Sequence, residues 1–284
     1  MPLQHKVFIS KRDSATRDGP PGSDHLRWVP TSSTLIYGER DAVLVDTQLT
    51  AGAANDLAEW VHASGKRLIA IYTTHAHGDH HFGTSIILKR FPDAKVLATP
   101  EVVTGMEHEL SPKGLHGFWE KSFPGQLPLE FASAQALQEA EFELEGEKLV
   151  VVKLGHTDCD DSTALWVPST GLLVAGDSVY SNTHPFMGQS GTIEARLEWC
   201  AALDKLAALH PKVVVGGHSD PDSSTEAEVI EGTKAYFENF NRIAESSNTA
   251  EEVYARMMEI YPTRLNPGSL WSGAKLVFPP TDQS

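Results

Sequence analysis

The chain has 284 residues, of which 40% are hydrophobic, and its 23 basic and 38 acidic side chains give a formal net charge of −15. This charge disfavours a nucleic-acid partner, which needs a basic face, and no apolar run approaches the roughly 20 residues that span a bilayer. Two cysteines do not make a disulfide framework. We therefore expect one cytoplasmic domain over residues 1–284, without a signal peptide or a membrane partner.

The first hundred residues predict alternating strands and helices. A short strand at 6–10 precedes a polar loop at 11–30, and strands at 34–37 and 42–46 are expected to form a hairpin. Thr50 is suited to cap a helix that runs to about His62. A strand at 68–72, a helix at 84–91 and a strand at 95–98 follow. This order is typical of a layered α/β fold.

Residues 100–140 interrupt this order, because prolines alternate with large apolar side chains such as Trp119. We expect an irregular helical insertion, which forms either a satellite core or an apolar wall or lid over a pocket. Strands are predicted again at 141–144, 148–154, 163–167, 172–175 and 213–215. Helices are predicted at 192–209, at 223–246 and from Thr249 onward, and the tail from Pro262 is expected to be irregular.

One motif stands out, H-x-H-x-D-H at residues 75–80, directly after the predicted strand at 68–72. By chance it is expected in on the order of one such chain in a thousand. Three further polar residues also follow apolar strands, so loops at the carboxyl ends of strands could bring all of them together. The candidate ligands are His75, His77, Asp79, His80, His156, Asp177 and His218.

Imidazole and carboxylate together suit Zn²⁺, with iron or manganese as alternatives. Seven such groups are too many for one tetrahedral ion, but they fit two ions that share a bridging carboxylate and a bridging water or hydroxide. A structural zinc site is closed by four ligands, which argues against a metal-binding module without catalysis. The sequence therefore predicts two metal ions per chain.

These motifs resemble those of the metallo-β-lactamase-fold hydrolases over about residues 34–220. The resemblance rests on H-x-H-x-D-H at 75–80, Gly155-His156-Thr157, Gly176-Asp177 and Gly217-His218, in that order. It implies an α/β fold, an αββα four-layer sandwich. The helical insertion around 100–140 and the C-terminal helices at 221–261 are added to this core by the patterns described above. The resemblance also implies that one zinc is held by His75, His77 and His156, that the other is held by Asp79, His80 and His218, and that Asp177 bridges them.

The ligand set is similar to that of the glyoxalase II and lactonase branches of this family. Tyr180 follows Asp177 by three residues, which resembles the quorum-lactone hydrolases, where a tyrosine directs its hydroxyl at the substrate. The alternative is a core tyrosine at a strand end. Asp46 serves either as a turn or capping residue or as a group that orients a metal-bound histidine. Asp158, Asp160 and Asp161 are expected to cap a turn.

We therefore expect a dinuclear zinc hydrolase that opens a small, hydrophobic cyclic amide or ester by attack of a metal-bound hydroxide. Asp79 would both ligate a metal and carry a proton to the leaving group, with Tyr180 stabilising the oxyanion. Substrate contacts are expected from His184, Phe186 and Trp119. Two alternatives remain, a thioester hydrolase of the glyoxalase II type and a mononuclear iron sulfur dioxygenase of the same fold.

Overall fold

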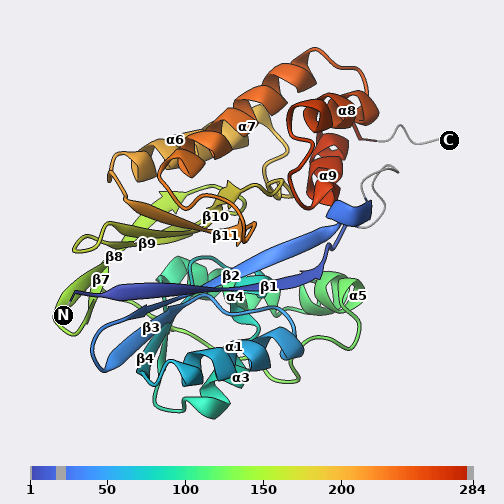
Figure 1. Cartoon of the computed structure of the whole chain (residues 1–284). Coiled ribbons are helices and arrows are strands. Elements are labelled where there is room, and N and C mark those ends of the chain that lie inside the picture. Colours follow the sequence, from blue (N-terminus) through green and yellow to red (C-terminus); the bar gives the residue numbers. More distant parts are fainter. Residues whose placement is uncertain (1, 17–23, 280–284) are drawn as a thin grey trace.

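Two mixed β-sheets pack face to face, and helices cover the outer face of each sheet (Figure 1). The computed structural model describes residues 2–16 and 24–279. The first sheet has the order β1-β2-β3-β4-β5-β6 and the second the order β11-β10-β9-β8-β7. The strands of the first sheet are β1 (Gln4–Asp13), β2 (Trp28–Tyr37), β3 (Asp41–Val45), β4 (Arg67–Tyr72), β5 (Lys95–Ala98) and β6 (Gln135–Ala136). Those of the second are β7 (Glu141–Leu144), β8 (Glu147–Gly155), β9 (Ser162–Val167), β10 (Leu172–Ser181) and β11 (Val213–Ser219).

Helices form the two outer layers. The first sheet is covered by α1 (Ala51–Ala63) and α3 (Thr84–Arg90), and the second by α6 (Ile193–Ala207) and α7 (Glu228–Glu245) (Figure 1). The remaining helical segments are η1 (Asp24–Leu26), α2 (Gly78–His81), α4 (Pro100–Glu109), η2 (Leu115–Trp119), α5 (Glu120–Ser122), α8 (Ala250–Ile260) and α9 (Pro267–Val277). None of the helices in the described ranges is both long enough and apolar enough to cross a bilayer.

The alternation of side chains along the strands explains the layers. On β2, Leu35 packs into the core shared with α1 and α3, whereas its neighbour Ile36 packs into the core between the sheets. On β3, Leu44 and Val43 divide in the same way, because successive residues of a strand point to opposite faces. A third core joins the second sheet to α6, α7, α8 and α9. The αββα sandwich is thereby confirmed.

Several predicted elements are confirmed in detail. Strands β2 and β3 pair antiparallel, with Thr34 opposite Val45. The Thr50 side chain caps α1 by accepting a hydrogen bond from the Ala53 N–H. The insertion over 100–140 contains α4, η2, α5 and the short strand β6, and is therefore irregular and largely helical as expected.

Two predictions near the chain ends are wrong. Residues 11–13 and 28–30 are strand, not loop, because β1 and β2 pair along their full length, from Gln4 opposite Tyr37 to Asp13 opposite Trp28. Residues 17–23 of the predicted loop lie outside the described residues. The tail is not irregular, because Pro267 in the first turn is compatible with a helix start and α9 follows. Both corrections matter for the site below.

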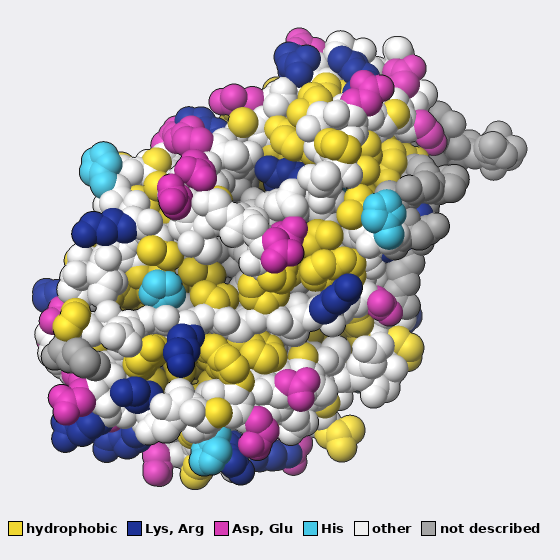
Figure 2. All heavy atoms as spheres, in the orientation of Figure 1, with side chains coloured by type: hydrophobic (Ala, Val, Ile, Leu, Met, Phe, Trp, Pro, Cys, Tyr) yellow, Lys and Arg dark blue, Asp and Glu magenta, His cyan; other side chains and the backbone are white. Residues whose placement is uncertain are grey.

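The distribution of charged side chains on the surface agrees with the excess of acidic residues in the sequence. On the face shown in Figure 2, basic side chains are scattered among acidic and hydrophobic ones and do not form a continuous stripe. That no nucleic acid binds this protein stays a prediction.

Candidate metal centre and its pocket

The candidate ligands come from strand ends on both sheets. His75 follows β4, His77 precedes α2, and Asp79 and His80 lie within that short helix. Asp177 lies on β10 and His218 on β11. Register shifts in the pairing of these two strands lie on either side of Gly176, and β10 continues to Ser181, beyond the predicted end at residue 175. The two sheets thus deliver their polar residues to one edge of the sandwich, as the carboxyl ends of strands in α/β proteins often do.

These residues form two adjacent clusters that can hold metal ions. In one, ligand atoms of His75, His77, Asp158 and Asp177 lie within 4.8 Å of one another, and in the other those of Asp79, His80 and His218 do. Asp177 lies between them, since its Oδ1 is 3.1 Å from His80 Nε2 and its Oδ2 is 3.1 Å from His218 Nε2. Its carboxylate therefore lies between the two clusters.

Unsatisfied buried atoms support a metal at this place. His75 Nε2, His80 Nε2, Asp158 Oδ2 and Asp177 Oδ1 are buried and make no well-formed hydrogen bond, although Asp158 Oδ2 lies 2.8 Å from His77 Nδ1 and Asp177 Oδ1 lies 3.1 Å from His80 Nε2. Such atoms are rare in folded proteins, and here they face one another across a few ångströms. A bound cation would satisfy all four. The residues present therefore fit a divalent metal centre.

Protein groups on the far side of the rings set which imidazole nitrogen faces the centre. Asp46 accepts hydrogen bonds from Thr74 N–H, Thr74 Oγ1 and His80 Nδ1, at 2.8, 2.8 and 3.0 Å. Because the Thr74 hydroxyl proton goes to Asp46, Thr74 Oγ1 accepts from His75 Nδ1, 3.0 Å away. His218 Nδ1 donates to the Pro30 carbonyl oxygen at 2.6 Å. Each of these rings turns the lone pair of Nε2 toward the centre.

Of the two readings of Asp46, the structure therefore favours orientation of a ligand. The residue has a left-handed backbone, with φ of 57°, and its side chain is buried. This geometry points the carboxylate at His80 and Thr74. Gly217 contributes by leaving space, because a Cβ there would overlap Asp177 Oδ1 and approach His80.

In the metal-free centre, each ionisable side chain changes the pKa of its neighbours. Burial works against protonation of His77 and His218, but Asp158 and Asp177 respectively outweigh it and raise each pKa to about 9. Burial likewise works against ionisation of Asp177, but His218 and His80 hold its pKa well below the usual range. A metal ion would have to displace protons from His77 and His218, so its affinity should fall as the pH falls.

The structure does not bring His156 into either cluster. Its Nδ1 lies 2.6 Å from Asp160 Oδ1 and its Nε2 lies 2.9 Å from Ser190 Oγ. Asp158 takes the expected place instead, with Oδ2 at 2.8 Å from His77 Nδ1 and 3.4 Å from His75 Nε2. Asp158 Oδ1 accepts from side-chain hydroxyls, so the structure does not support its expected turn-capping role, whereas the expected ligand role of His156 stays a prediction. A signal was present, because the loop at 156–161 carries three carboxylates, more than one turn needs.

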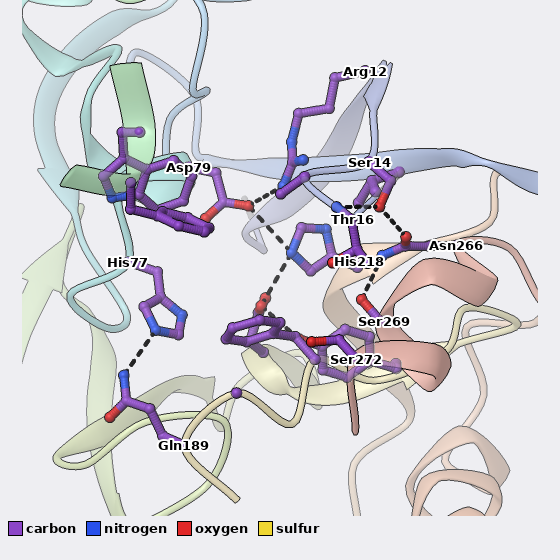
Figure 3. Close-up of a pocket in the computed structure, with 18 of the residues that line it drawn as sticks. Arg12, Ser14, Thr16, His77, Asp79, Gln189, His218, Asn266, Ser269 and Ser272 are labelled. Atoms are coloured by element: carbon purple, nitrogen blue, oxygen red, sulfur yellow. Dashed lines mark hydrogen bonds and ion pairs between the residues drawn. The ribbon is translucent and has the colours of Figure 1, made fainter. Parts of the chain in front are cut away.

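Both clusters open into a cavity of about 430 Å³, which His77, Asp79, Asp177 and His218 help to line. Its lining is part apolar and part polar, and most of the polar side chains are labelled in Figure 3. The apolar wall contains Val29, Phe118, Trp119, Phe186 and Leu276. The polar wall contains Arg12, Ser14, Thr16, Asn266, Ser269 and Ser272. Sequence reasoning missed the polar wall, which comes from the end of β1 and from the first turns of α9.

Hydrogen bonds join the two halves of the polar wall. Ser14 Oγ donates to Asn266 Oδ1 at 2.6 Å, and Asn266 Nδ2 donates to Ser269 Oγ at 2.7 Å (Figure 3). Arg12 lies on the same wall, donates from Nη2 to Asp79 Oδ2 and stacks over the ring of Phe123. Burial works against ionisation of Asp79, but Arg12 and His80 hold its pKa well below the usual range. Asp79 is therefore a carboxylate that already has a cation beside it.

The remaining predicted site residues divide between the pocket and the core. Trp119 and Phe186 line the pocket, and the Phe186 ring meets His77 edge to face at 5.6 Å. His184 lies outside the pocket lining, because it is buried with its Nδ1 3.0 Å from the Tyr236 hydroxyl. The expected substrate contact of His184 thus gives way to a structural one. Tyr180 lines the pocket, but its hydroxyl donates to Asp177 Oδ2 at 2.7 Å.

Comparison with known proteins agrees with this geometry. Residues 26–218 match the model of the metallo-beta-lactamase superfamily. The chain is 24% identical over 217 residues to a metallo-beta-lactamase type 2 from Bacteroides fragilis, which covers 72% of this chain and 74% of that relative.

Solved structures show the same fold. A metallo-beta-lactamase from Pontibacter korlensis superposes with a TM-score of 0.61 at 18% identity, covering 84% of this chain and 99% of that one. A metallo-beta-lactamase family protein from Thermus thermophilus superposes with a TM-score of 0.64 at 19% identity, covering 96% and 92%. The family model spans most of the chain and includes both metal-ligand clusters. The protein belongs to the metallo-beta-lactamase superfamily.

Proposed function

We propose that the protein is a hydrolase that uses two divalent metal ions to open a small cyclic amide or ester, a lactam or a lactone. The observation that carries this proposal is the pair of imidazole and carboxylate clusters that share Asp177 and open into one pocket. The similarity to a relative named as a metallo-beta-lactamase supports a lactam in particular. Zinc is the first candidate for the metal, and iron or manganese are the alternatives.

One ion would be held by His75, His77 and Asp158, the other by Asp79, His80 and His218, and Asp177 would contact both. Divalent ions in such a site lower the pKa of bound water and polarise a carbonyl group. The orientation of the rings by Thr74, Asp46 and the Pro30 carbonyl prepares the Nε2 atoms for this task.

Tyr180 and Asp79 supply the remaining polar chemistry. Burial, together with the nearby Asp177 carboxylate, holds the pKa of Tyr180 well above its usual value, so the hydroxyl keeps its proton. It is a neutral hydrogen-bond donor that holds Asp177 in position, with 2.7 Å between the hydroxyl oxygen and Asp177 Oδ2. Asp79 stays ionised beside Arg12, which favours a role in holding charge in place over a role as a proton carrier. This differs from the roles expected from the sequence.

The two walls of the pocket suggest the shape of the substrate. Phe118, Trp119 and Phe186 offer aromatic surface for an apolar ring or side chain. The facing hydroxyls and the amide of the polar wall suit carbonyl and amide groups. We therefore expect an amphipathic molecule, hydrophobic on one side and able to form hydrogen bonds on the other.

The thioester alternative has weaker support. A glutathione-like substrate needs cations to bind its carboxylates, and among the described lining residues Arg12 is the one lysine or arginine, already paired with Asp79. The iron dioxygenase alternative requires a single metal, whereas the ligands here form two clusters.

The test reconstitutes the metal-free protein with zinc, iron(II) or manganese(II), measures bound metal, and assays a chromogenic cephalosporin, an aryl lactone and a glutathione thioester side by side. Asp177→Asn is the inactive control. Lys148→Ala, which removes an exposed ion pair, controls for effects of mutation, purification and metal removal that do not involve the site. We expect turnover of a lactam or lactone with close to two metals per chain, lost in Asp177→Asn. Turnover of the thioester alone, or full activity with one iron per chain, would overturn the proposal.

A further inference from the structure

We infer that Asp158 replaces His156 as a ligand in the cluster around His75 and His77, and that the resulting set of two imidazoles and two carboxylates shifts metal preference from zinc toward manganese(II). This rests on the proposed metal centre but not on the identity of the substrate. The conclusion follows from the loop after β8, from the fixed position of His156, and from the chemistry of the donors.

The loop after β8 directs Asp158 inward. Gly155 ends the strand in a left-handed conformation, with φ of 84°, and the chain turns sharply there. Asp158 is fully buried, and its Oδ1 accepts a hydrogen bond from Thr157 Oγ1 at 2.8 Å. Its other oxygen, Oδ2, makes no well-formed hydrogen bond and lies 2.8 Å from His77 Nδ1 and 3.4 Å from His75 Nε2. A buried carboxylate oxygen in this position calls for a cation.

His156 is held outside the centre by contacts at both ring nitrogens. Asp160 Oδ1 lies 2.6 Å from Nδ1 and Ser190 Oγ lies 2.9 Å from Nε2. Ser190 is itself fixed, because it is buried and donates to the Thr157 carbonyl oxygen at 2.6 Å. These contacts connect the loop at 156–161 to the segment at 188–190, whose Gly188 and Gln189 line the pocket. His156 is therefore a positioning residue for the pocket wall.

The donor set determines which metals this cluster favours. Beside two neutral imidazoles, this cluster offers the carboxylate of Asp158 and the shared carboxylate of Asp177. Three imidazoles with one carboxylate would be a softer set. Carboxylate donors suit manganese(II), whereas imidazole donors suit zinc. Exchange of one imidazole for a carboxylate should therefore lower the ratio of zinc to manganese affinity.

The first experiment compares His156→Ala with Asp158→Asn, two variants of neighbouring loop residues. Each is made metal-free and titrated with zinc and with manganese, and bound metal is counted after gel filtration. Circular dichroism checks the fold. We expect His156→Ala to keep the wild-type stoichiometry with affinity within about threefold, and Asp158→Asn to lose at least about tenfold in affinity at one site. Loss of an ion in His156→Ala, with full binding in Asp158→Asn, would overturn the assignment.

The second experiment tests preference by Asp158→His, which restores a three-imidazole set. We expect this variant to raise the ratio of zinc to manganese affinity by about tenfold over wild type. An unchanged or lower ratio would overturn the inferred metal preference. If Asp158→His does not fold, the first experiment still tests the assignment of Asp158 as a ligand. Wild-type protein that binds no metal would overturn both this inference and the proposed function. Asp158-dependent metal binding without turnover of any lactam or lactone would overturn the proposed function alone.

Discussion

Asp46 offers a sharp test of how the protein prepares its metal ligands, through the substitution Asp46→Asn. The carboxylate is buried and accepts three hydrogen bonds, two from Thr74 and one from His80. Asparagine has the same shape and also tolerates the left-handed backbone at this position. It differs in having one accepting oxygen and one donating nitrogen. The substitution therefore reverses hydrogen-bond polarity with little change in packing.

The reversal should reach both histidines. If the amide oxygen keeps the bond from Thr74 N–H, the amide nitrogen takes the place of Oδ2 and donates. His80 Nδ1 must then accept, which moves the ring proton to Nε2, the atom facing Asp177. Thr74 Oγ1 also becomes an acceptor of the amide and gives its own proton to His75 Nδ1. Both Nε2 atoms then carry a proton and cannot bind a metal.

Loss of such an orienting partner typically lowers metal affinity by about 10- to 100-fold, or about 1.4 to 2.7 kcal/mol. Isothermal titration of metal-free wild type and Asp46→Asn with zinc at one pH measures this loss, and thermal unfolding checks stability. Asp46→Ala is the comparison, since it leaves three donors unpaired and should cost about 3 kcal/mol of folding free energy. Wild-type zinc affinity in a folded Asp46→Asn would refute the reasoning.

Three further outcomes are expected. Gly217→Ala should fold poorly or lose metal, because the added Cβ overlaps Asp177, and metal content after purification measures this; a fully loaded variant would contradict it. Arg12→Met should lower the metal-free unfolding free energy by about 3 kcal/mol, since Asp79 stays buried without its cation. Saturating zinc should reduce that loss of unfolding free energy. Denaturant unfolding of wild type and Arg12→Met with and without zinc measures both effects, and an equal loss in zinc would contradict the prediction. The N–H groups of Arg40, Asp41 and Glu39 lower the pKa of Glu145 from 4.5 to about 2. Glu145→Gln should therefore be destabilised above about pH 5, with the difference vanishing as the pH falls to about 2; an equal difference at every pH would contradict this.

Sequence periodicity predicted the layered α/β order, because its physics is local, whereas the four-layer sandwich was implied by the resemblance of the motifs to a known family. Leu35 and Ile36, or Val43 and Leu44, alternate between two apolar faces, which is the pattern of a strand buried on both sides. The H-x-H-x-D-H motif likewise lies within six residues after β4, so the backbone alone brings its side chains near one another. For these parts, spacing along the chain predicts proximity in space.

Spacing could not decide between His156 and Asp158. Both lie in the same loop, and their roles depend on the left-handed turn at Gly155 and on Ser190, 34 residues from His156. Arg12 was missed for a similar reason, since its partner Asp79 lies 67 residues away. A motif identifies which loop reaches the site, but the direction of each side chain depends on partners distant in sequence.

The contact between Ser14 and Asn266 has a consequence for how the protein handles its ligands. It joins residues 252 positions apart, so this wall closes only when the two ends of the chain have come together. The metal clusters are built from residues 75–218 and do not include that wall. Arg12 on the same wall pairs with Asp79, so β1 links the closure of the two chain ends to a residue of the ligand cluster.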